Sequence, residues 1–202
     1  MKFEKVLAER KDKVIYKDGD KCIKVFDESY KLKKEDLIDL IELARFSPCG
    51  KNGQYLRFIP IYQEEILKKI YPYLAWAAYL KDWNGPTEGE RPTGIILVVS
   101  NEGSLNDAIL SCDMGIVSQS IMLGATEKNL GGCMIRALNR KKIAEVLSLP
   151  ENYVIHIALA IGKPAQNVIV EDINEGDDIK YWMDQDKTHH VPKIILDDLI
   201  ID

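Results

Sequence analysis

The segment SPCGKNGQ, residues 47–54, carries more polar side chains than a connection between two secondary-structure elements requires. A connector needs only one or two turn residues. This one contains the hydroxyl of Ser47, the thiol of Cys49 and the amides of Asn52 and Gln54. Short polar side chains of this kind can hydrogen-bond a ligand at close range. The segment is therefore either an irregular helix exit or a loop whose polar groups bind something.

A second candidate is the stretch KCIKVF, which places two cations, Lys21 and Lys24, close together. Most lysines are solvated surface residues, so the stretch alone does not indicate a site. The stretch nevertheless offers two cations on one short strand or turn.

A third candidate is NLGGCM, in which Gly131 and Gly132 follow Leu130. Adjacent glycines often end a helix, where a left-handed backbone conformation is needed. They also let a backbone N–H approach a flat ligand, because glycine has no Cβ. Both interpretations are open from the sequence.

The sequence shows no further catalytic or metal-binding motif. The motifs GxSxG, HExxH, GxGxxG and the P-loop are absent from the sequence. The pair His189 and His190 has no further ligands beside it, so we expect solvated surface residues and no metal site. The cysteines lack CxxC spacing, which predicts reduced thiols in a cytoplasmic protein. They are Cys22, Cys49, Cys112 and Cys133.

Size and charge restrict the class of protein. A chain of 202 residues is best explained as a single domain over residues 1–202. Its net charge of −5 provides no basic field for nucleic acid or an anionic membrane. The start MKFEKVLAERKDK is too charged for a signal peptide, and we expect no apolar run of membrane-spanning length.

Hydrophobic periodicity predicts the elements that position these residues. We expect helices over Glu35–Phe46, Glu64–Tyr71, Asn106–Lys128 and Lys141–Leu149, and strands over Arg57–Tyr62, Gly94–Val99 and Tyr153–Ile161. Helices and strands mix without strict βαβ alternation, which predicts an α+β fold with a mostly antiparallel or mixed central sheet flanked by helices. The long third helix is apolar on more than one face, so it should be buried in the fold or between subunits. From Asn167 the tail is polar and looks loop-rich.

In order and spacing, the three candidate stretches resemble the FMN-dependent nitroreductase superfamily. KCIKVF occupies the place of its R-S-x-R-x-F motif, and SPCGKNGQY that of S-P-S-x-x-N-x-Q-P. NLGG and the later IGKP correspond to G-L-G-G/T and to a strand ending in G-K/Y-P. The resemblance extends from about Lys21 to Asp198.

The resemblance implies an FMN-dependent NAD(P)H oxidoreductase in which the flavin performs the chemistry and no side chain acts as acid or base. Lys21 and Lys193 would hold the phosphate of FMN. Lys24 would lie toward the pyrimidine side of the ring, where a positive charge stabilises the anionic reduced flavin. A backbone N–H near Gly131 or Gly132 would face N5. The implied cofactor-binding residues are Lys21, Cys22, Lys24, Ser47, Cys49, Asn52, Gln54, Leu130, Gly131, Gly132 and Lys193.

The resemblance also implies a homodimer with FMN at the interface. In this family the loop after the second helix reaches across to the partner's flavin, which would explain the polar groups of residues 47–54. Ser47, Cys49 and Asn52 would contact the phosphate and ribityl chain. The tail, about residues 167–202, would wrap the partner subunit.

The implied reaction is ping-pong electron transfer from NADH or NADPH, through N5 of FMN, to a small electron-poor acceptor of nitroaromatic or quinone type. Three alternatives remain: a non-catalytic flavin- or nucleotide-binding module, a specialised flavin enzyme such as a reductive dehalogenase, and a dimeric scaffold whose pocket is vestigial. Several residues depart from the family pattern, with lysines in place of arginines and Cys22 and Cys49 in place of serines. Because lysine lacks the bidentate fork of arginine, we expect weaker FMN binding than is typical.

Overall fold

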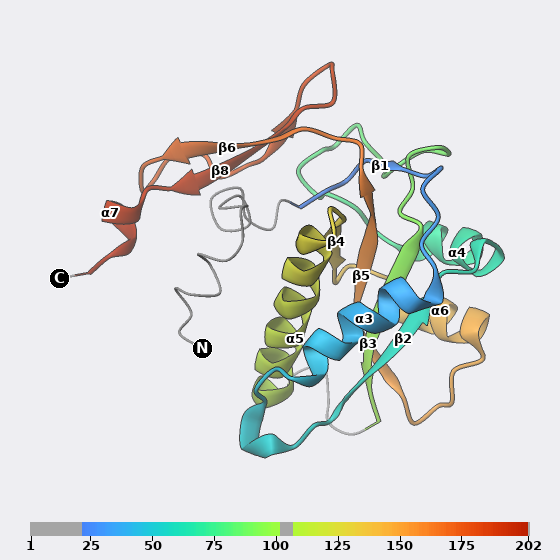
Figure 1. The fold of residues 1–202 in the computed structure, drawn as a ribbon. Coiled ribbons are helices and arrows are strands. Elements are labelled where there is room, and N and C mark those ends of the chain that lie inside the picture. The colour runs from blue at the N-terminus through green and yellow to red at the C-terminus, as the bar shows by residue number, and fades with distance from the viewer. Residues whose placement is uncertain (1–21, 102–106, 202) are drawn as a thin grey trace.

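The computed structural model describes residues 22–101 and 107–201 of the chain, and its central layer is a five-stranded sheet (Figure 1). The sheet order is β1-β5-β3-β2, and β4 also pairs with β5. The strands are β1 (Phe26–Asp27), β2 (Leu56–Ile61), β3 (Gly94–Ser100), β4 (Gly131–Ile135) and β5 (Val154–Pro164). Every pairing among these strands is antiparallel. The α+β prediction is confirmed.

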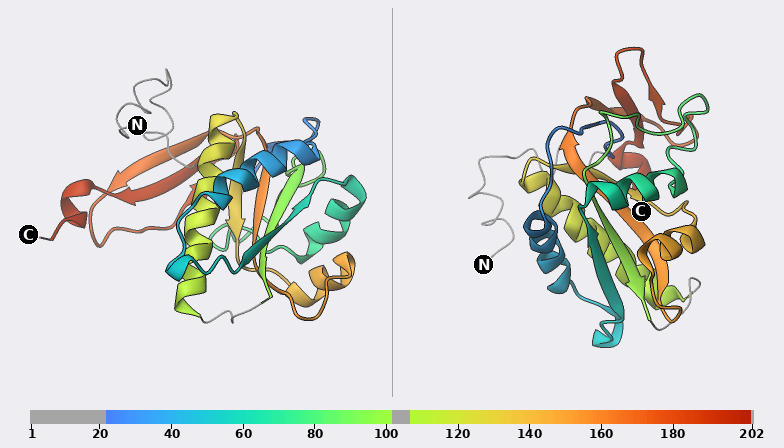
Figure 2. Two further views of the ribbon diagram at one scale, coloured as in Figure 1. Left: turned by 60° about the horizontal axis from the view of Figure 1, so that its bottom comes forward. Right: turned by 90° about the vertical axis from the view of Figure 1, so that its right-hand side faces the viewer.

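Helices cover both faces of this sheet, as the two views of Figure 2 show. One face is covered by α3 and α5, and the other by α4 and α6. The helices are α3 (Lys34–Arg45), α4 (Glu64–Ile70), α5 (Ala108–Glu127), α6 (Arg140–Leu147) and the short α7 (Leu196–Leu199), with 3₁₀ turns η1 (Gly50–Asn52) and η2 (Tyr71–Tyr73).

The apolar run of β3 explains how the two layers are joined. Ile96 and Val98 pack into the core under α3 and α5, whereas Ile95 and Leu97 pack under α4 and α6. All seven residues of β3 are buried. A strand covered on both faces loses the polar alternation of a half-exposed strand, so the sequence pattern predicted its place correctly.

The long helix α5 has a polar side-chain cap at its N-terminus and a left-handed residue just after its C-terminus. The side chain of Asp107 accepts a hydrogen bond of 2.7 Å from the backbone N–H of Leu110, which caps the first turn. After the helix, Asn129 has the left-handed conformation, with φ 55°. Gly131 and Gly132 lie in β4 instead, so the interpretation of these glycines as a helix cap is wrong.

By length and composition, α5 is the one helix in the described part of the chain that could cross a membrane. This corrects the expectation that no apolar run has that length. Half of its most apolar window is buried inside the fold, and the core helix of a soluble protein meets the same criterion. The feature is weak evidence for a membrane.

The C-terminal segment forms a second, three-stranded sheet in the order β6-β8-β7, which projects from the central layer (Figure 1). Its strands are β6 (Val168–Ile173), β7 (Trp182–Met183) and β8 (His189–Ile194). The pairing of β6 with β8 is parallel, and that of β7 with β8 is antiparallel. The expectation of a loop-rich tail is therefore wrong for these residues.

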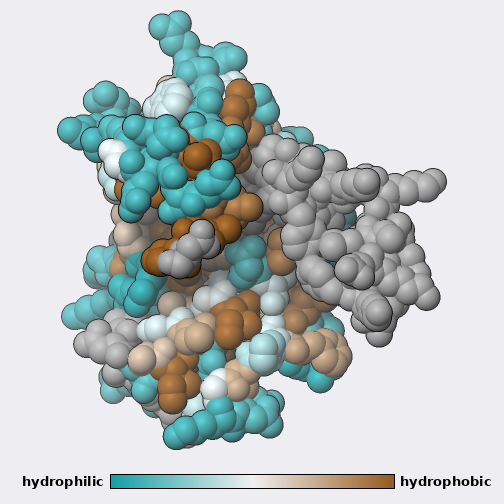
Figure 3. All heavy atoms as spheres, turned by 90° about the vertical axis from the view of Figure 1, so that its left-hand side faces the viewer, coloured by the Kyte–Doolittle hydropathy of each residue, from teal (hydrophilic) through white to brown (hydrophobic). Residues whose placement is uncertain are grey.

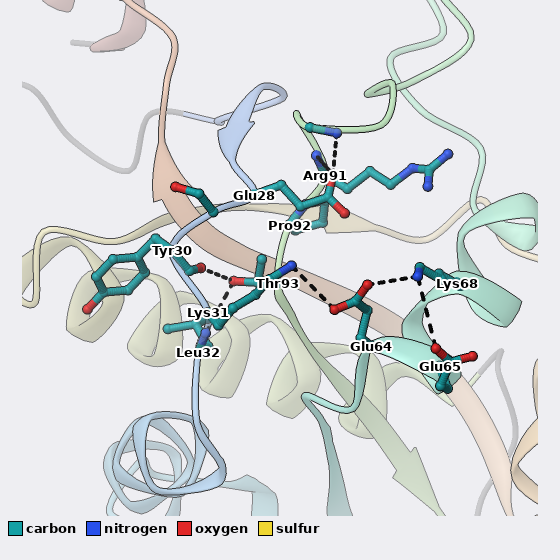
Figure 4. A network of polar contacts seen from close by, with 12 residues as sticks. Glu28, Tyr30, Lys31, Leu32, Glu64, Glu65, Lys68, Arg91, Pro92 and Thr93 are labelled. Carbon is teal, nitrogen blue, oxygen red and sulfur yellow. Dashed lines mark hydrogen bonds and ion pairs between the residues drawn. The ribbon is translucent and has the colours of Figure 1, made fainter.

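A network of polar contacts fixes the segment that follows Lys24 to the rest of the fold (Figure 4). The hydroxyl of Thr93 donates to the backbone oxygen of Tyr30 over 2.7 Å and accepts from the N–H of Leu32. The carboxylate of Glu28 accepts from the N–H of Arg91 over 3.2 Å. These bonds tie residues 28–32 to the chain just before β3, and so restrain the neighbouring stretch that carries Lys24.

Candidate functional site

Lys24 is the centre of the candidate site because its ammonium is buried without a described counter-charge. Only 3% of the residue is exposed. Its Nζ lies 3.3 Å from Nε2 of His189, 3.5 Å from Sγ of Cys22 and 4.7 Å from the ring centroid of Tyr181. None of these neighbours is a carboxylate. Burying a cation without an anionic partner costs free energy, so an anionic or electron-rich ligand group would fit here.

His189 supplies the second polar group of the site. Burial, and then the neighbouring ammonium of Lys24, lower the pKa of His189 to about 4. The ring is therefore neutral at neutral pH, and Nε2 accepts from Lys24. Its Nδ1 is buried and has no hydrogen-bond partner among the described residues.

The sequence-based prediction that His189 and His190 are solvated is wrong. His189 is fully buried, and His190 lies between two carboxylates, 2.6 Å from Glu171 and 2.9 Å from Asp184. These hydrogen bonds raise the pKa of His190. No local sequence pattern indicates that His189 contacts Lys24, because the two residues are 165 positions apart.

The glycines of β4 lie against the stretch that carries Lys24. The N–H of Ile23 donates to the backbone oxygen of Gly132 over 2.8 Å. A Cβ on Gly132 would lie 2.4 Å from the backbone oxygen of Ala160, and one on Gly131 would lie 2.6 Å from the side chain of Ile23. Glycine is thus required by close packing between strands. Leu130 is buried in the core under α3 and α5, so only its backbone could contact a ligand.

The polar loop of residues 47–54 is an ordered structure held against α5. The N–H of Gly50 donates to the carboxylate of Asp113 over 2.8 Å, and the hydroxyls of Ser47 and Ser120 lie 2.8 Å apart. Asn52 and Gln54 have φ values of 53° and 50°. Left-handed residues other than glycine cost roughly 1–2 kcal/mol each, a strain that is often found at functional sites.

A pocket of about 310 Å³ opens beside this loop. Ser47, Cys49 and Gln54 line it together with apolar side chains of α3 and β2, including Ile41 and Phe58. A volume at the lower end of the range for small-molecule sites, with a few polar groups at one side, would suit part of a ligand.

One protomer does not bring the two sets of predicted residues together. The polar loop contacts α5 at Asp113, whereas Gly132 lies against Met122. Nine residues of helix correspond to about 14 Å along its axis. The structure unites Cys22, Lys24, Gly131 and Gly132, with Leu130 adjacent, and places Ser47, Cys49, Asn52 and Gln54 toward the other end of α5.

The two predicted phosphate ligands lie elsewhere. Lys193 is exposed on β8, opposite Asp172 of β6. It is four residues beyond His189, or about 13 Å along a strand. Lys21 lies outside the described residues.

The surface beside the polar loop of residues 47–54 carries exposed apolar side chains. Phe46 is 70% exposed, and Leu43 and Ile109 are each 41% exposed. Figure 3 views the molecule from the side to which the tail sheet projects and shows several hydrophobic patches there. Exposed apolar patches of this kind often mark interaction surfaces.

Comparison with known proteins gives consistent matches. A family model described as the nitroreductase family matches residues 21–163. A curated relative, "Putative NAD(P)H nitroreductase YodC" of Bacillus subtilis (strain 168), is 21% identical over 172 residues, which are 70% of this chain and 84% of that protein.

Two solved structures are similar to this chain in fold. A nitroreductase family protein from Clostridium novyi NT has a TM-score of 0.58 and 24% identity, covering 81% of this chain and 86% of that one. An FMN-dependent nitroreductase from Clostridium difficile R20291 has a TM-score of 0.56 and 20% identity, covering 72% and 83%. At these identities the structural likeness establishes the fold.

Proposed function

The chain belongs to the nitroreductase family, and from this membership we propose that it is an FMN-dependent oxidoreductase that uses NADH or NADPH as electron donor. The matched region runs from the KCIKVF stretch through β5, so it includes the buried lysine and the glycines of β4. The similar proteins named above as an NAD(P)H nitroreductase and as an FMN-dependent nitroreductase support the same donor and cofactor.

The observation that carries this proposal is the burial of Lys24 without a described carboxylate partner. When bound, FMN supplies hydride chemistry between a nicotinamide and an acceptor. Lys24 would stabilise negative charge on the pyrimidine side of the ring, since an ammonium shielded from water interacts strongly with such charge. The site residues therefore fit the cofactor at its electron-rich end. Lys21 and Lys193 remain our proposed ligands of the phosphate.

We propose that the active unit is a homodimer whose two flavin sites lie at the interface. A second copy would bring its own polar loop to the Lys24 end of α5, which the single chain leaves about 14 Å away. Ile109 and Cys112 are exposed on α5, and a helix with an apolar outer face favours a partner.

We also propose that the tail, about residues 167–202, contacts the partner subunit, while residues 1–202 form one nitroreductase-like domain. Beyond β8 the chain carries an exposed apolar series, in which Leu196 is 69% and Leu199 62% exposed. Ile201 is 98% exposed. Covering such residues with another surface would stabilise the contact by about 25 cal/mol for each Å² of apolar surface buried.

The finer proposal concerns the acceptor and the order of the reaction. Donor and acceptor would use the same open face of the flavin in turn, which gives ping-pong kinetics. The acceptor is a small electron-poor molecule of nitroaromatic or quinone type. The location we propose is the cytoplasm, because the cysteine usage is that of a reducing compartment.

The test is a flavin titration followed by anaerobic reduction. We expect the purified protein to bind added FMN, and NADH or NADPH to bleach the flavin absorbance. Lys24→Met should weaken FMN binding, whereas Lys69→Met, at an exposed lysine on α4, should not. If the purified protein does not bind added FMN, the proposal is excluded. If FMN binds but its visible absorbance is bleached by neither NADH nor NADPH, a non-catalytic binding module is favoured instead.

A further inference from the structure

We propose that Cys22 and Cys133 form a redox-active dithiol that low-molecular-weight disulfides oxidise to an intramolecular disulfide. Their Sγ atoms lie 3.0 Å apart, although 111 positions separate them in the chain. Both residues are thiols in the structure. The inference concerns thiol chemistry beside the proposed flavin site, since Cys22 contacts Lys24. Its readout does not require FMN or NAD(P)H.

The backbone holds the two thiols side by side. Cys22 forms an isolated bridge with Gly132, and the N–H of Ile23 donates to the backbone oxygen of the same glycine over 2.8 Å. Cys133 is the next residue of β4. Neighbouring extended chains lie about 4.8 Å apart, and a disulfide joins Cα atoms about 4.4–6.8 Å apart. Side-chain rotation that closes the sulfur separation by about 1 Å is therefore sufficient.

The two thiols differ in exposure and in electrostatic environment, which assigns their roles. Cys22 is half-buried, and the ammonium of Lys24 donates to its Sγ over 3.5 Å. A neighbouring positive charge favours the thiolate, which is the attacking form in thiol–disulfide exchange. Cys133 is 8% exposed. Cys22 is thus the attacking thiol, and Cys133 is the thiol that resolves the mixed disulfide.

The reaction balances without a metal or a further oxidant. The Cys22 thiolate attacks one sulfur of the small disulfide, so that its S–S bond breaks and one small thiol leaves with a proton. Cys133 then loses its proton and attacks the sulfur of Cys22, which releases the second small thiol. The two cysteines lose two electrons and two protons, and the small disulfide gains them.

Oxidation would also change the surroundings of Lys24. A disulfide sulfur is neutral and cannot become a thiolate, so the ammonium would lose its one potentially anionic neighbour among the contacts described above. The redox state of the pair would therefore alter the charge balance at the buried lysine.

The test uses the full-length protein, reduced and free of flavin, incubated with glutathione disulfide. After acid quenching, unreacted thiols are alkylated, and the protein is digested for peptide mass mapping. We expect a peptide pair linked through Cys22 and Cys133, and the loss of two alkylatable thiols. In Cys133→Ser the reaction should stop with glutathione attached to Cys22. Cys112→Ser, an exposed cysteine on α5, is the matched control and should keep the linked pair.

Two outcomes would overturn the proposal. The first is wild-type protein in which Cys22 and Cys133 stay alkylatable while Cys112 is glutathionylated, a result that needs no variant to fold. The second is a folded Cys133→Ser protein that does not retain glutathione on Cys22. Neither outcome bears on whether the protein binds FMN, so failure here is distinguishable from failure of the proposed function.

Discussion

Replacing Lys24 by methionine should make the flavin-free protein more stable and the flavin complex weaker. The two effects have one cause, a buried ammonium that has no carboxylate among its described neighbours. Methionine has a similar length and no charge, so it removes the desolvation cost while filling most of the same space. Opposite signs for stability and binding would separate a ligand-binding lysine from a structural one.

The expected magnitude follows from the contacts of Lys24. Burial of the ammonium costs several kcal/mol. The two hydrogen bonds of Lys24 are long, at 3.3 and 3.5 Å, and one acceptor is a sulfur atom, so each offsets only about 1 kcal/mol, less than a well-formed bond from a charged group. The contact with the Tyr181 ring offsets about 1 kcal/mol more. Loss of the donor to His189 leaves Nε2 unpaired, which costs about 1 kcal/mol. The net result is a gain in unfolding free energy of about 1 kcal/mol.

Binding of FMN should change in the other direction. A hydrogen bond from a charged group contributes about 1.5–3 kcal/mol, which corresponds to roughly 10- to 150-fold in affinity. Urea denaturation of the flavin-free protein measures stability, and quenching of flavin fluorescence measures affinity. Lys69→Met, at an exposed lysine, is the control for both assays. A less stable Lys24→Met protein with unchanged FMN affinity would show that the lysine serves the fold and would refute this reasoning.

Four further predictions concern packing, pH and assembly. Gly132→Ala should destabilise the protein by about 1–3 kcal/mol in urea, because its Cβ would lie 2.4 Å from a backbone oxygen of β5; Gly115→Ala, with open space, should not. The pKa of His189 is lowered to about 4, so its contribution to stability is present above pH 6.5 and lost as pH falls toward 4. His189→Gln should therefore reduce the pH dependence of the unfolding free energy, measured in urea, between pH 4 and 6.5. The pKa of His190 is raised, so its contribution is complete below pH 6.5 and lost at higher pH, and His190→Gln should remove that opposite dependence. Ile109→Glu should shift sedimentation toward a monomer, since it puts a charge on the outer face of α5; an unchanged dimer would place the interface elsewhere.

Local patterns in the sequence predicted the central layers because those elements follow simple periodicities. The apolar run of β3 and the single buried face of α3, with Leu37, Leu40 and Ala44, can each be recognised within one short window. The tail sheet has no such signal. Its long strands β6 and β8 pair in parallel across a connection that contains the two-residue β7, and a two-residue strand has no measurable period.

The candidate site was predictable only in part, for the same reason. Family motifs indicated Cys22, Lys24 and the glycines of β4, and the structure places these together. The role of Gly132 was missed, because its clash partner is the backbone of a strand almost thirty residues later. The contact of His189 with Lys24 depends on how the tail folds back, and no motif encodes that long-range contact.

Lys24 and its neighbour His189 are synthesised at very different times, which matters for folding on the ribosome. Lys24 emerges early, whereas His189 emerges 165 residues later. At translation rates of roughly 5–20 residues per second, about 8–33 s pass between the synthesis of Lys24 and that of His189. During that interval β5, which pairs with β1, β3 and β4, is also incomplete for most of the time. The nascent chain therefore spends most of its elongation without a finished sheet, a stage at which chaperones would find their binding sites exposed.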